Sequence, residues 1–202
     1  MKLGLLADIH EHNRHLRMAL HAFRHERVDQ VVVLGDVIDR GNRIEESCRL
    51  LKEVAAIGVW GNHDFGLCYD PAEWARRKYS QAVLDFMASL QPSLEIEGCR
   101  FTHIEPWLDP YDVSDLWNLD MLPYTTERLA RSFGAVQNRV MIMGHIHQYF
   151  AATPTGLLDW HGEQAIRLDA QTRYLIGLAA LHDGKYAVLD TCTDQLIPLS
   201  YR

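Results

Sequence analysis

Leu3-Gly4-Leu5-Leu6-Ala7-Asp8-Ile9-His10 opens the pattern that decides the fold, a short apolar run that ends in an acid and a histidine. Similar runs lead into Gly35-Asp36-Val37-Ile38-Asp39-Arg40, Gly61-Asn62-His63-Asp64 and Gly144-His145-Ile146-His147. Short runs rich in aliphatic residues are typical of buried parallel strands, and an open α/β sheet gathers its ligands at the strand ends. The pattern therefore predicts polar loops at one edge of a sheet. Their oxygen and imidazole donors indicate a metal centre.

The segments between these runs have helical periodicity. The predicted helices are 13–27, 44–54, 71–91 and 125–136, and the predicted strands are 3–7, 31–34, 57–60, 94–96, 99–103, 140–143, 156–160, 173–181, 185–190 and 196–199. The alternation of strand and helix in the first half predicts a parallel sheet with right-handed crossovers. Towards the end of the chain, His182-Asp183-Gly184 is typical of a hairpin turn. We therefore expect an α/β fold: a four-layer α-β-β-α sandwich of two mixed sheets, with the metal site at the carboxyl ends of the strands.

The composition is that of an ordinary globular protein with one domain over residues 1–202. A net charge of -7 gives no general attraction for nucleic acid polymers or anionic membranes. No stretch has the length and apolar character of a signal peptide or a bilayer span. The cysteines lack CxxC spacing, which indicates reduced thiols in a cytoplasmic protein; they are Cys48, Cys68, Cys99 and Cys192. Nothing in the sequence indicates the oligomeric state.

Two neighbouring divalent cations need a bridging carboxylate, a mixture of carboxylate, imidazole and amide donors, and an open position for water and substrate. Asp8 and His10 stand two residues apart at a strand end, so their side chains can converge on one ion if the chain turns there. His145 and His147 have the same spacing and can reach one metal each.

The other clusters complete such a set. Asp36 follows a glycine that allows close approach of the backbone, which suits a bridging position. Asn62 is a neutral oxygen donor that adds no further negative charge. His63 can protonate a leaving oxygen, and the neighbouring Asp64 can orient its imidazole. Arg40 carries a planar fork that matches phosphate oxygens.

In this order the clusters resemble the signature of the calcineurin-like metallophosphoesterases: D-x-H, GDxxDR, GNH followed by Asp or Glu, a lone histidine, and GHxH. The resemblance covers the chain from Asp8 to His147 and makes His103 the lone histidine. It implies two divalent transition-metal ions roughly 3.5–4 Å apart, Mn, Fe, Zn or Co, with manganese favoured. One ion would be held by Asp8, His10, Asp36 and His147, and the other by Asp36, Asn62, His103 and His145.

The resemblance also implies a mechanism. A metal-bridging hydroxide would attack phosphorus in line, while Arg40 and the metals hold the non-bridging oxygens. His63 would protonate the leaving alkoxide with Asp64 behind it. Asp39 would fix a ligand or a metal-bound water.

Three departures from the family pattern leave the substrate class open. Ile104 follows the lone histidine where the family usually has glycine, which predicts a less strained backbone or a different turn. Residues 35–41 resemble the serine/threonine phosphatase and dinucleoside-tetraphosphatase branch, whereas residues 144–147 resemble the phosphodiesterase branch. The Asn-Pro-Gly-Ser segment of small bacterial phosphodiesterases is absent, and Tyr174-Leu175-Ile176-Gly177 stands roughly in its place.

Other residues admit both a functional and a structural interpretation. His12 and Arg14 follow the first ligand loop and either bind substrate phosphate or simply begin a helix. The segment 104–124 is either a lid, with aromatic rings that stack a nucleobase and acids that repel long polyanions, or a packed Ω-loop. Its acids are Glu105, Asp109, Asp112, Asp115 and Asp120, and its larger aromatics are Trp107, Tyr111, Trp117 and Tyr124. His161 and His182, in C-terminal turns, are expected to be structural.

These observations favour an enzyme that hydrolyses a small phosphodiester or phosphoanhydride of nucleotide type. His63 favours diesters, whose alkoxide leaving groups need a proton, whereas Arg40 favours a terminal phosphate and hence a phosphomonoesterase or protein phosphatase. A non-catalytic scaffold of the same fold would show gaps in the ligand set, and this chain shows none. A nuclease or a regulatory phosphatase would usually add a further domain, for which this length leaves no room.

Overall fold

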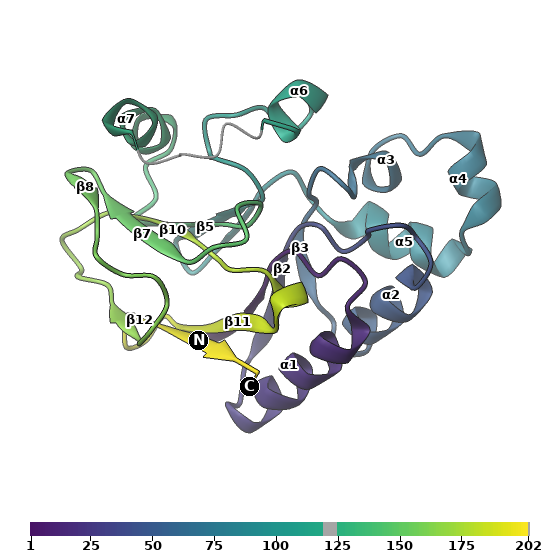
Figure 1. Ribbon diagram of the computed structural model, residues 1–202, viewed down its shortest axis with the longest axis horizontal. Helices are drawn as coiled ribbons and strands as arrows, with labels where there is room; N and C mark the ends of the chain where they lie inside the picture. Colours follow the sequence, from purple (N-terminus) through teal and green to yellow (C-terminus); the bar gives the residue numbers. More distant parts are fainter. Residues whose placement is uncertain (119–124, 202) are drawn as a thin grey trace.

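Two six-stranded mixed sheets pack face to face in the computed structural model, which describes residues 1–118 and 125–201 (Figure 1). The first sheet has the order β3 (Ile57–Val59), β2 (Gln30–Leu34), β1 (Lys2–Leu6), β11 (Lys185–Asp190), β12 (Gln195–Ser200) and β9 (Ile166–Arg167). The second has the order β4 (Leu94–Ile96), β5 (Cys99–Thr102), β6 (Val140–Met143), β10 (Tyr174–Gly177), β7 (Phe150–Thr153) and β8 (Gly156–Leu157). Two sheets with helices outside confirm the predicted α/β sandwich.

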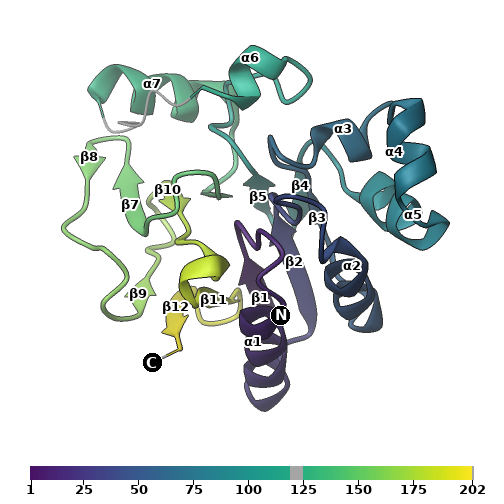
Figure 2. The same ribbon diagram turned by 45° about the vertical axis from the view of Figure 1, so that its right-hand side comes forward.

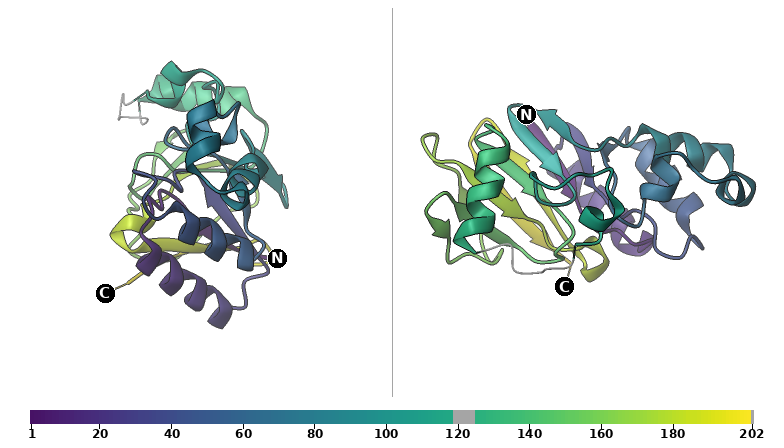
Figure 3. Two further views of the ribbon diagram at one scale, coloured as in Figure 1. Left: turned by 90° about the vertical axis from the view of Figure 1, so that its right-hand side faces the viewer. Right: turned by 90° about the horizontal axis from the view of Figure 1, so that it is seen from above.

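The core explains the layers, because the strands are apolar on both faces. Leu3 and Leu5 of β1 pack into the cluster between the two sheets, whereas Leu6 points to the outer face. That outer face is covered by α1 (Asn13–His25), α2 (Ile44–Glu53) and α5 (Gln81–Ser89), and the outer face of the second sheet by α7 (Thr126–Ala135), as Figures 2 and 3 show. Among the described residues, no helix combines the length and apolar character needed to cross a bilayer.

The predicted polar loops follow the carboxyl ends of parallel strands. β1, β2 and β3 run parallel in the first sheet, and β5, β6 and β10 run parallel in the second. The two sets of ends meet across the sandwich, since Nδ1 of His103, directly after β5, lies 2.7 Å from the carbonyl oxygen of Leu34 at the end of β2. The topology therefore gathers the loops of both sheets at one edge.

The single helix expected over 71–91 is instead two helices, α4 (Glu73–Lys78) and α5. The break falls at Ser80, whose extended backbone and hydroxyl cap α5 by accepting a hydrogen bond from the Val83 N–H. The Glu45 carboxylate of α2 accepts hydrogen bonds from the N–H and hydroxyl of Ser80. A tertiary contact thus fixes the helix start, and the apolar periodicity of the segment does not show it. A short helix that was not expected, α3 (Phe65–Cys68), precedes the pair.

The hairpin expected at residues 182–184 is wrong. Leu181–Asp183 forms a short 3-10 helix, η1, and Gly184 follows it with a left-handed φ of +77°. The flanking strands β10 and β11 belong to different sheets, so this turn carries the chain across the sandwich. Two strands, β7 and β9, were not expected, because β7 is a short run that is buried throughout and lacks alternation, and β9 is only two residues long.

Candidate metal centre

The first group of metal-donor side chains comes from the loops that follow β1, β2 and β6. The Nε2 atom of His147 lies 3.3 Å from Oδ1 of Asp8 and 3.4 Å from Nε2 of His10. Nε2 of His10 in turn lies 3.7 Å from Oδ2 of Asp36. Carboxylate and imidazole atoms at these separations can converge on one transition-metal ion. The four residues that the resemblance assigns to one ion are therefore neighbours.

The second group lies on the other side of Asp36. Nε2 of His103 is 3.6 Å from Oδ2 of Asp36 and 3.0 Å from Oδ1 of Asn62. Nδ1 of His145 is also 3.0 Å from Oδ1 of Asn62. The residues assigned to the other ion are thus in contact as well.

Asp36 faces both groups with a single oxygen. Its Oδ2 approaches His10 on one side and His103 on the other, while its Oδ1 accepts a hydrogen bond of 3.0 Å from the backbone N–H of His63. Burial raises the pKa of Asp36 well above its usual value, and the carboxylates of Asp64 and Asp8 raise it further. Several buried carboxylates packed together call for a compensating cation, so this donor set fits divalent metal ions.

The backbone around these donors is strained. Positive φ angles between 44° and 69° occur at Asp8, His10, Asp36, His145 and His147. L-residues adopt this conformation at a cost, and such strain concentrates where function requires it. His103 and Ile104 have no positive φ, in agreement with the weaker strain expected from the isoleucine at position 104.

Two glycines let the loops approach one another closely. A Cβ atom at Gly35 would lie 2.3 Å from Nδ1 of His103, and one at Gly61 would lie 2.1 Å from Oδ1 of Asp36. No side chain fits at those distances. Glycine is therefore required before Asp36 and before Asn62 because there is no room for a side chain, and not only because of the turn geometry.

Two histidines have one ring nitrogen engaged by a backbone carbonyl. Nδ1 of His103 donates to the Leu34 carbonyl, which leaves Nε2 as the free nitrogen beside Asn62. Nε2 of His145 lies 3.3 Å from the Asn118 carbonyl, which leaves Nδ1 beside Asn62. Such contacts select the tautomer and orient the ring for a metal.

The imidazoles of His10, His63 and His145 are neutral at neutral pH. Burial lowers the pKa of His10 and of His145 to about 4, and it also lowers the pKa of His63. A hydrogen bond with Asp8 raises the pKa of His147. Metal ligation requires unprotonated imidazole, so His10 and His145 are already in the required state.

Asp64 has a different environment from the one expected of an orienting carboxylate. It is fully buried and accepts hydrogen bonds from the backbone N–H groups of Val37, Ile38 and Gly61. The bonds from Val37 and Ile38 join the loop after β2 to the loop after β3. Asp64 acts on the neighbouring His63 imidazole through its charge. Burial lowers the pKa of His63, and the negative charge of Asp64 opposes that effect.

We therefore expect Asp64→Asn to reduce stability. The amide group would face a backbone N–H in place of an accepting oxygen, and we expect the free energy of unfolding to fall by about 1–3 kcal/mol. Denaturant melts of the metal-free protein measure this change. An unchanged midpoint, combined with a loss of diester hydrolysis, would instead favour the orienting role.

A hollow of about 210 Å³ opens beside the first donor group. It is lined by His10, Glu11, His12, Asp39, Arg40, Asn42 and Arg43. The Arg40 side chain is 83% exposed and lies 3.9 Å from the Asp39 carboxylate, so its guanidinium is accessible to a ligand. Arg14 is exposed and is not part of this lining, whereas Arg43, which the sequence did not single out, is.

Glu11 was also missed in the sequence and supports this hollow. It is buried, and its Oε2 accepts hydrogen bonds from the backbone N–H groups of Asn42 and Arg43 at 3.1 and 3.2 Å. Glu11 thereby ties the arginine-bearing loop to the ligand loop after β1. The only indication of this role in the sequence is that a glutamate directly follows the D-x-H motif.

The start of the segment after His103 is packed. Ile104, Leu108 and Leu116 form a small apolar cluster, and the buried Glu105 pairs with Arg128 of α7. This half supports the Ω-loop interpretation.

The rest of the described segment contains α6 (Val113–Leu116); Leu116 belongs to that buried cluster, whereas most of the other side chains from Asp109 to Trp117 are exposed. Asp109 and Asp112 accept hydrogen bonds from nearby backbone N–H groups, so their carboxylates stabilise turns. Trp117 is 46% exposed, and its ring centroid lies 5.1 Å from that of His63. An accessible aromatic ring therefore borders the candidate metal centre. Asp120 and Tyr124 lie outside the described residues.

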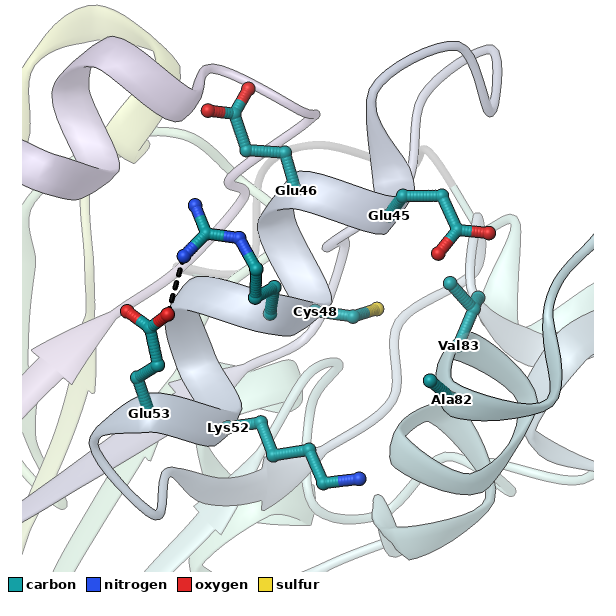
Figure 4. A pocket seen from close by; sticks show the side chains of 8 residues that line it. Glu45, Glu46, Cys48, Lys52, Glu53, Ala82 and Val83 are labelled. Carbon is teal, nitrogen blue, oxygen red and sulfur yellow. Dashed lines mark hydrogen bonds and ion pairs between the residues drawn. The ribbon is translucent and has the colours of Figure 1, made fainter.

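A larger hollow of about 660 Å³ lies elsewhere, between α2 and α5 (Figure 4). It is lined by Glu45, Glu46, Cys48, Arg49, Lys52, Glu53, Ala82 and Val83. Burial raises the pKa of the Cys48 thiol, which leaves it protonated and unreactive. The smaller hollow, and not this one, adjoins the metal-donor side chains and Arg40.

A sandwich of two sheets with aspartate, asparagine and histidine donors at its parallel strand ends has the construction of a metal-dependent hydrolase. The chain belongs to the calcineurin-like phosphoesterase superfamily, whose domain model matches residues 1–172. This match confirms the resemblance seen in the sequence. The protein is accordingly a phosphoric-ester hydrolase of a family that uses divalent metal ions.

Individual relatives agree with the family assignment. A phosphodiesterase of Methanocaldococcus jannaschii is 27% identical over 170 residues, covering 79% of this chain and 93% of the relative. A metallophosphoesterase crystal structure from Sphaerobacter thermophilus has a TM-score of 0.79 at 20% identity, covering 100% of this chain and 89% of the other. An archaeal phosphodiesterase structure has a TM-score of 0.57 at 17% identity and full coverage of both chains.

Proposed function

We propose that the protein is a dinuclear-metal phosphoesterase that hydrolyses a small, nucleotide-like phosphodiester or phosphoanhydride. The observation that carries this proposal is the position of Asp36, whose Oδ2 lies 3.7 Å from Nε2 of His10 and 3.6 Å from Nε2 of His103. One carboxylate oxygen between two donor groups is the arrangement that a pair of neighbouring ions requires.

When bound, the ions would supply an activated water and neutralise charge on the phosphate. The residues of the chain would do the rest. Arg40 and Arg43, at the adjoining hollow, would hold phosphate oxygens from the solvent side. His63, next to Asn62 in sequence, would pass a proton to the leaving oxygen. The mixture of carboxylate, amide and imidazole donors suits manganese, iron, zinc or cobalt, with manganese as our first choice. A cytoplasmic location remains a prediction.

The aromatic edge of the site supports a nucleotide-like substrate. Trp117, whose ring contacts that of His63, is about half exposed; Tyr111 is also about half exposed and meets the ring of Trp60 edge-on with centroids 5.5 Å apart. Exposed rings beside a phosphate site can stack a nucleobase. Names among the similar proteins are compatible with this proposal: one relative is a phosphodiesterase, and a structure of the same fold, with a TM-score of 0.59 at 16% identity, is described as a candidate diadenosine tetraphosphatase.

We expect Trp117→Ala to weaken binding of dinucleoside polyphosphates. Loss of one stacking surface, at roughly 1–3 kcal/mol per base, should raise KM about 10-fold and leave kcat nearly unchanged. Hydrolysis of an inorganic polyphosphate, which has no base, should keep its KM. Trp74→Ala is the matched control, because Trp74 is 61% exposed on α4. Equal KM changes for both substrates would argue against stacking.

A second prediction concerns His63. If its imidazole protonates the leaving alkoxide, His63→Ala should lower kcat for a diester by about 10²–10⁴-fold. An activated aryl phosphomonoester, whose leaving group needs no proton, should be spared. Steady-state rates on both substrates with the same metal-loaded preparation measure this split, and equal losses would contradict the acid role.

The proposed function is tested by stripping the protein of metal and reloading it with manganese. Hydrolysis of an aryl phosphate, a bis-aryl phosphodiester and diadenosine tetraphosphate is then compared. We expect turnover of the diester and the tetraphosphate to exceed that of the monoester. Failure on all three, with two metals bound, would refute the proposal.

The second candidate function is a phosphomonoesterase, and the observation that favours it is the position of Arg40. Its guanidinium is accessible beside the first donor group, and a terminal phosphate gains most from an additional cation. A preference for the aryl monoester in the same comparison would favour this alternative.

A further inference from the structure

A histidine beyond the family motifs lies at the metal centre. The ring centroid of His182 is 4.8 Å from that of His147 and 5.4 Å from that of His10. One ring nitrogen from each of these three histidines lies within 4.8 Å of the others. The sequence placed His182 in a C-terminal turn with a structural role, so this proximity was not expected.

The topology explains how His182 reaches this position. β10 runs parallel to β6, and η1 follows β10 at the edge where the other ligand loops lie. The backbone N–H of Leu181 donates to the Ala7 carbonyl at 2.8 Å, and that of His182 to the Asp8 carbonyl at 3.2 Å. His182 is therefore joined by its main chain to the first ligand loop. Its side chain is presented as the other ligands are, from the carboxyl end of a parallel strand.

The backbone of His182 is held from a second side as well. Nδ1 of His15, on α1, lies 3.1 Å from the Leu181 carbonyl and 3.0 Å from the His182 carbonyl. Contacts from the loop after β1 and from α1 thus fix the short helix that bears the imidazole. A ligand held in this way needs little reorganisation on binding.

The two nitrogens of the His182 ring have different environments. Nε2 lies 3.3 Å from Oδ1 of Asp183. Nδ1 is buried and has no hydrogen-bond partner among the described residues. A histidine that ligates a metal commonly gives its other nitrogen to a carboxylate, which orients the ring and strengthens the ligand. Asp183 would supply that carboxylate, and Nδ1 would be the metal-binding atom.

We propose that His182 is an additional ligand of the ion held by Asp8, His10 and His147, oriented by Asp183. The inference rests on the proposed dinuclear centre and deepens it. The two metal positions then differ, because three imidazoles meet at the first and two, from His103 and His145, at the second. Imidazole donors favour later metals such as cobalt and zinc over manganese, so the first position should discriminate in favour of cobalt and zinc more than the second position does.

Titration of the metal-free protein with Co²⁺ tests whether His182 is a ligand, with calorimetry for affinity and visible absorption for coordination. The wild-type protein should bind two ions. His182→Ala should weaken one binding step by at least about 10–100-fold, change its absorption band and leave the other step intact. Asp183→Asn should weaken the same step less. Free imidazole should restore the lost band in His182→Ala.

His161→Ala is the matched control, because His161 is exposed and also stands near a carboxylate, that of Asp159, at 3.9 Å. It should bind cobalt like the wild type. An unchanged spectrum and unchanged affinities in His182→Ala would overturn the inference while leaving the proposed function intact. Equal weakening of both steps would also overturn it, because it would indicate general damage. A wild-type protein that binds fewer than two ions would refute the proposed function as well.

Discussion

Asp36→Asn is expected to abolish binding of the metal pair and with it nearly all hydrolysis. The amide keeps the oxygen that accepts the His63 N–H, but it removes the negative charge between His10 and His103. A change to an outer partner of a metal ligand costs 10–100-fold, and loss of the shared ligand should cost on the order of 10³-fold or more in kcat/KM. Metal content after dialysis and steady-state rates measure the two effects.

The same substitution should stabilise the metal-free protein. Asp36 is buried with Asp8 and Asp64 close by, and like charges in a dry site oppose folding. A neutral residue of the same shape relieves this repulsion, so the melting temperature of the metal-free variant should rise, by roughly 2–4 °C for each kcal/mol gained. Retention of two tightly bound ions by Asp36→Asn would contradict the bridging assignment.

Gly61→Ala is expected to be nearly as damaging, although it adds only a methyl group. Its Cβ would lie 2.1 Å from Oδ1 of Asp36 and 2.7 Å from the Asp36 backbone nitrogen. Because the contact is partly with backbone, one of the two loops must move, and an ångström of misplacement at a reacting centre can cost on the order of 10²-fold in rate. Manganese affinity and kcat/KM should therefore both fall sharply.

Gly134→Ala is the control for this substitution. Nothing lies within 4 Å of a Cβ at Gly134, which is in α7, and alanine there should stabilise the helix by roughly 0.5–1 kcal/mol. Wild-type metal affinity in Gly61→Ala would show that the Asp36 loop tolerates displacement, which contradicts its close packing against residue 61.

The layers of the fold were predictable because strand burial on both faces leaves a clear sequence signal. Leu3 and Leu5 face one core and Leu6 another, so their run is apolar throughout. The break at Ser80 was not predictable, because it depends on Glu45 from a different helix. The crossing at Leu181–Asp183 was misinterpreted as a hairpin because turn residues show that a chain turns but not which sheet it enters.

The site, like the fold, has features that the sequence predicts and features that depend on contacts between distant segments. Motif spacing identified a donor set that the structure brings together around Asp36. It did not identify Glu11 or His182, since their roles depend on which loops become neighbours in space. Asp64 was recognised as part of the site, but its carboxylate binds backbone N–H groups. These contacts depend on how distant loops meet in the folded chain, and the order of residues carries no signal for that.

The central claim is that two ions share the carboxylate of Asp36. Electron paramagnetic resonance of the manganese-loaded protein tests it most directly. With two equivalents of Mn²⁺, we expect an exchange-coupled spectrum from a dinuclear centre that Asp36→Asn eliminates. A spectrum of isolated Mn²⁺ ions at full loading, or binding of a single ion per chain, would contradict the account.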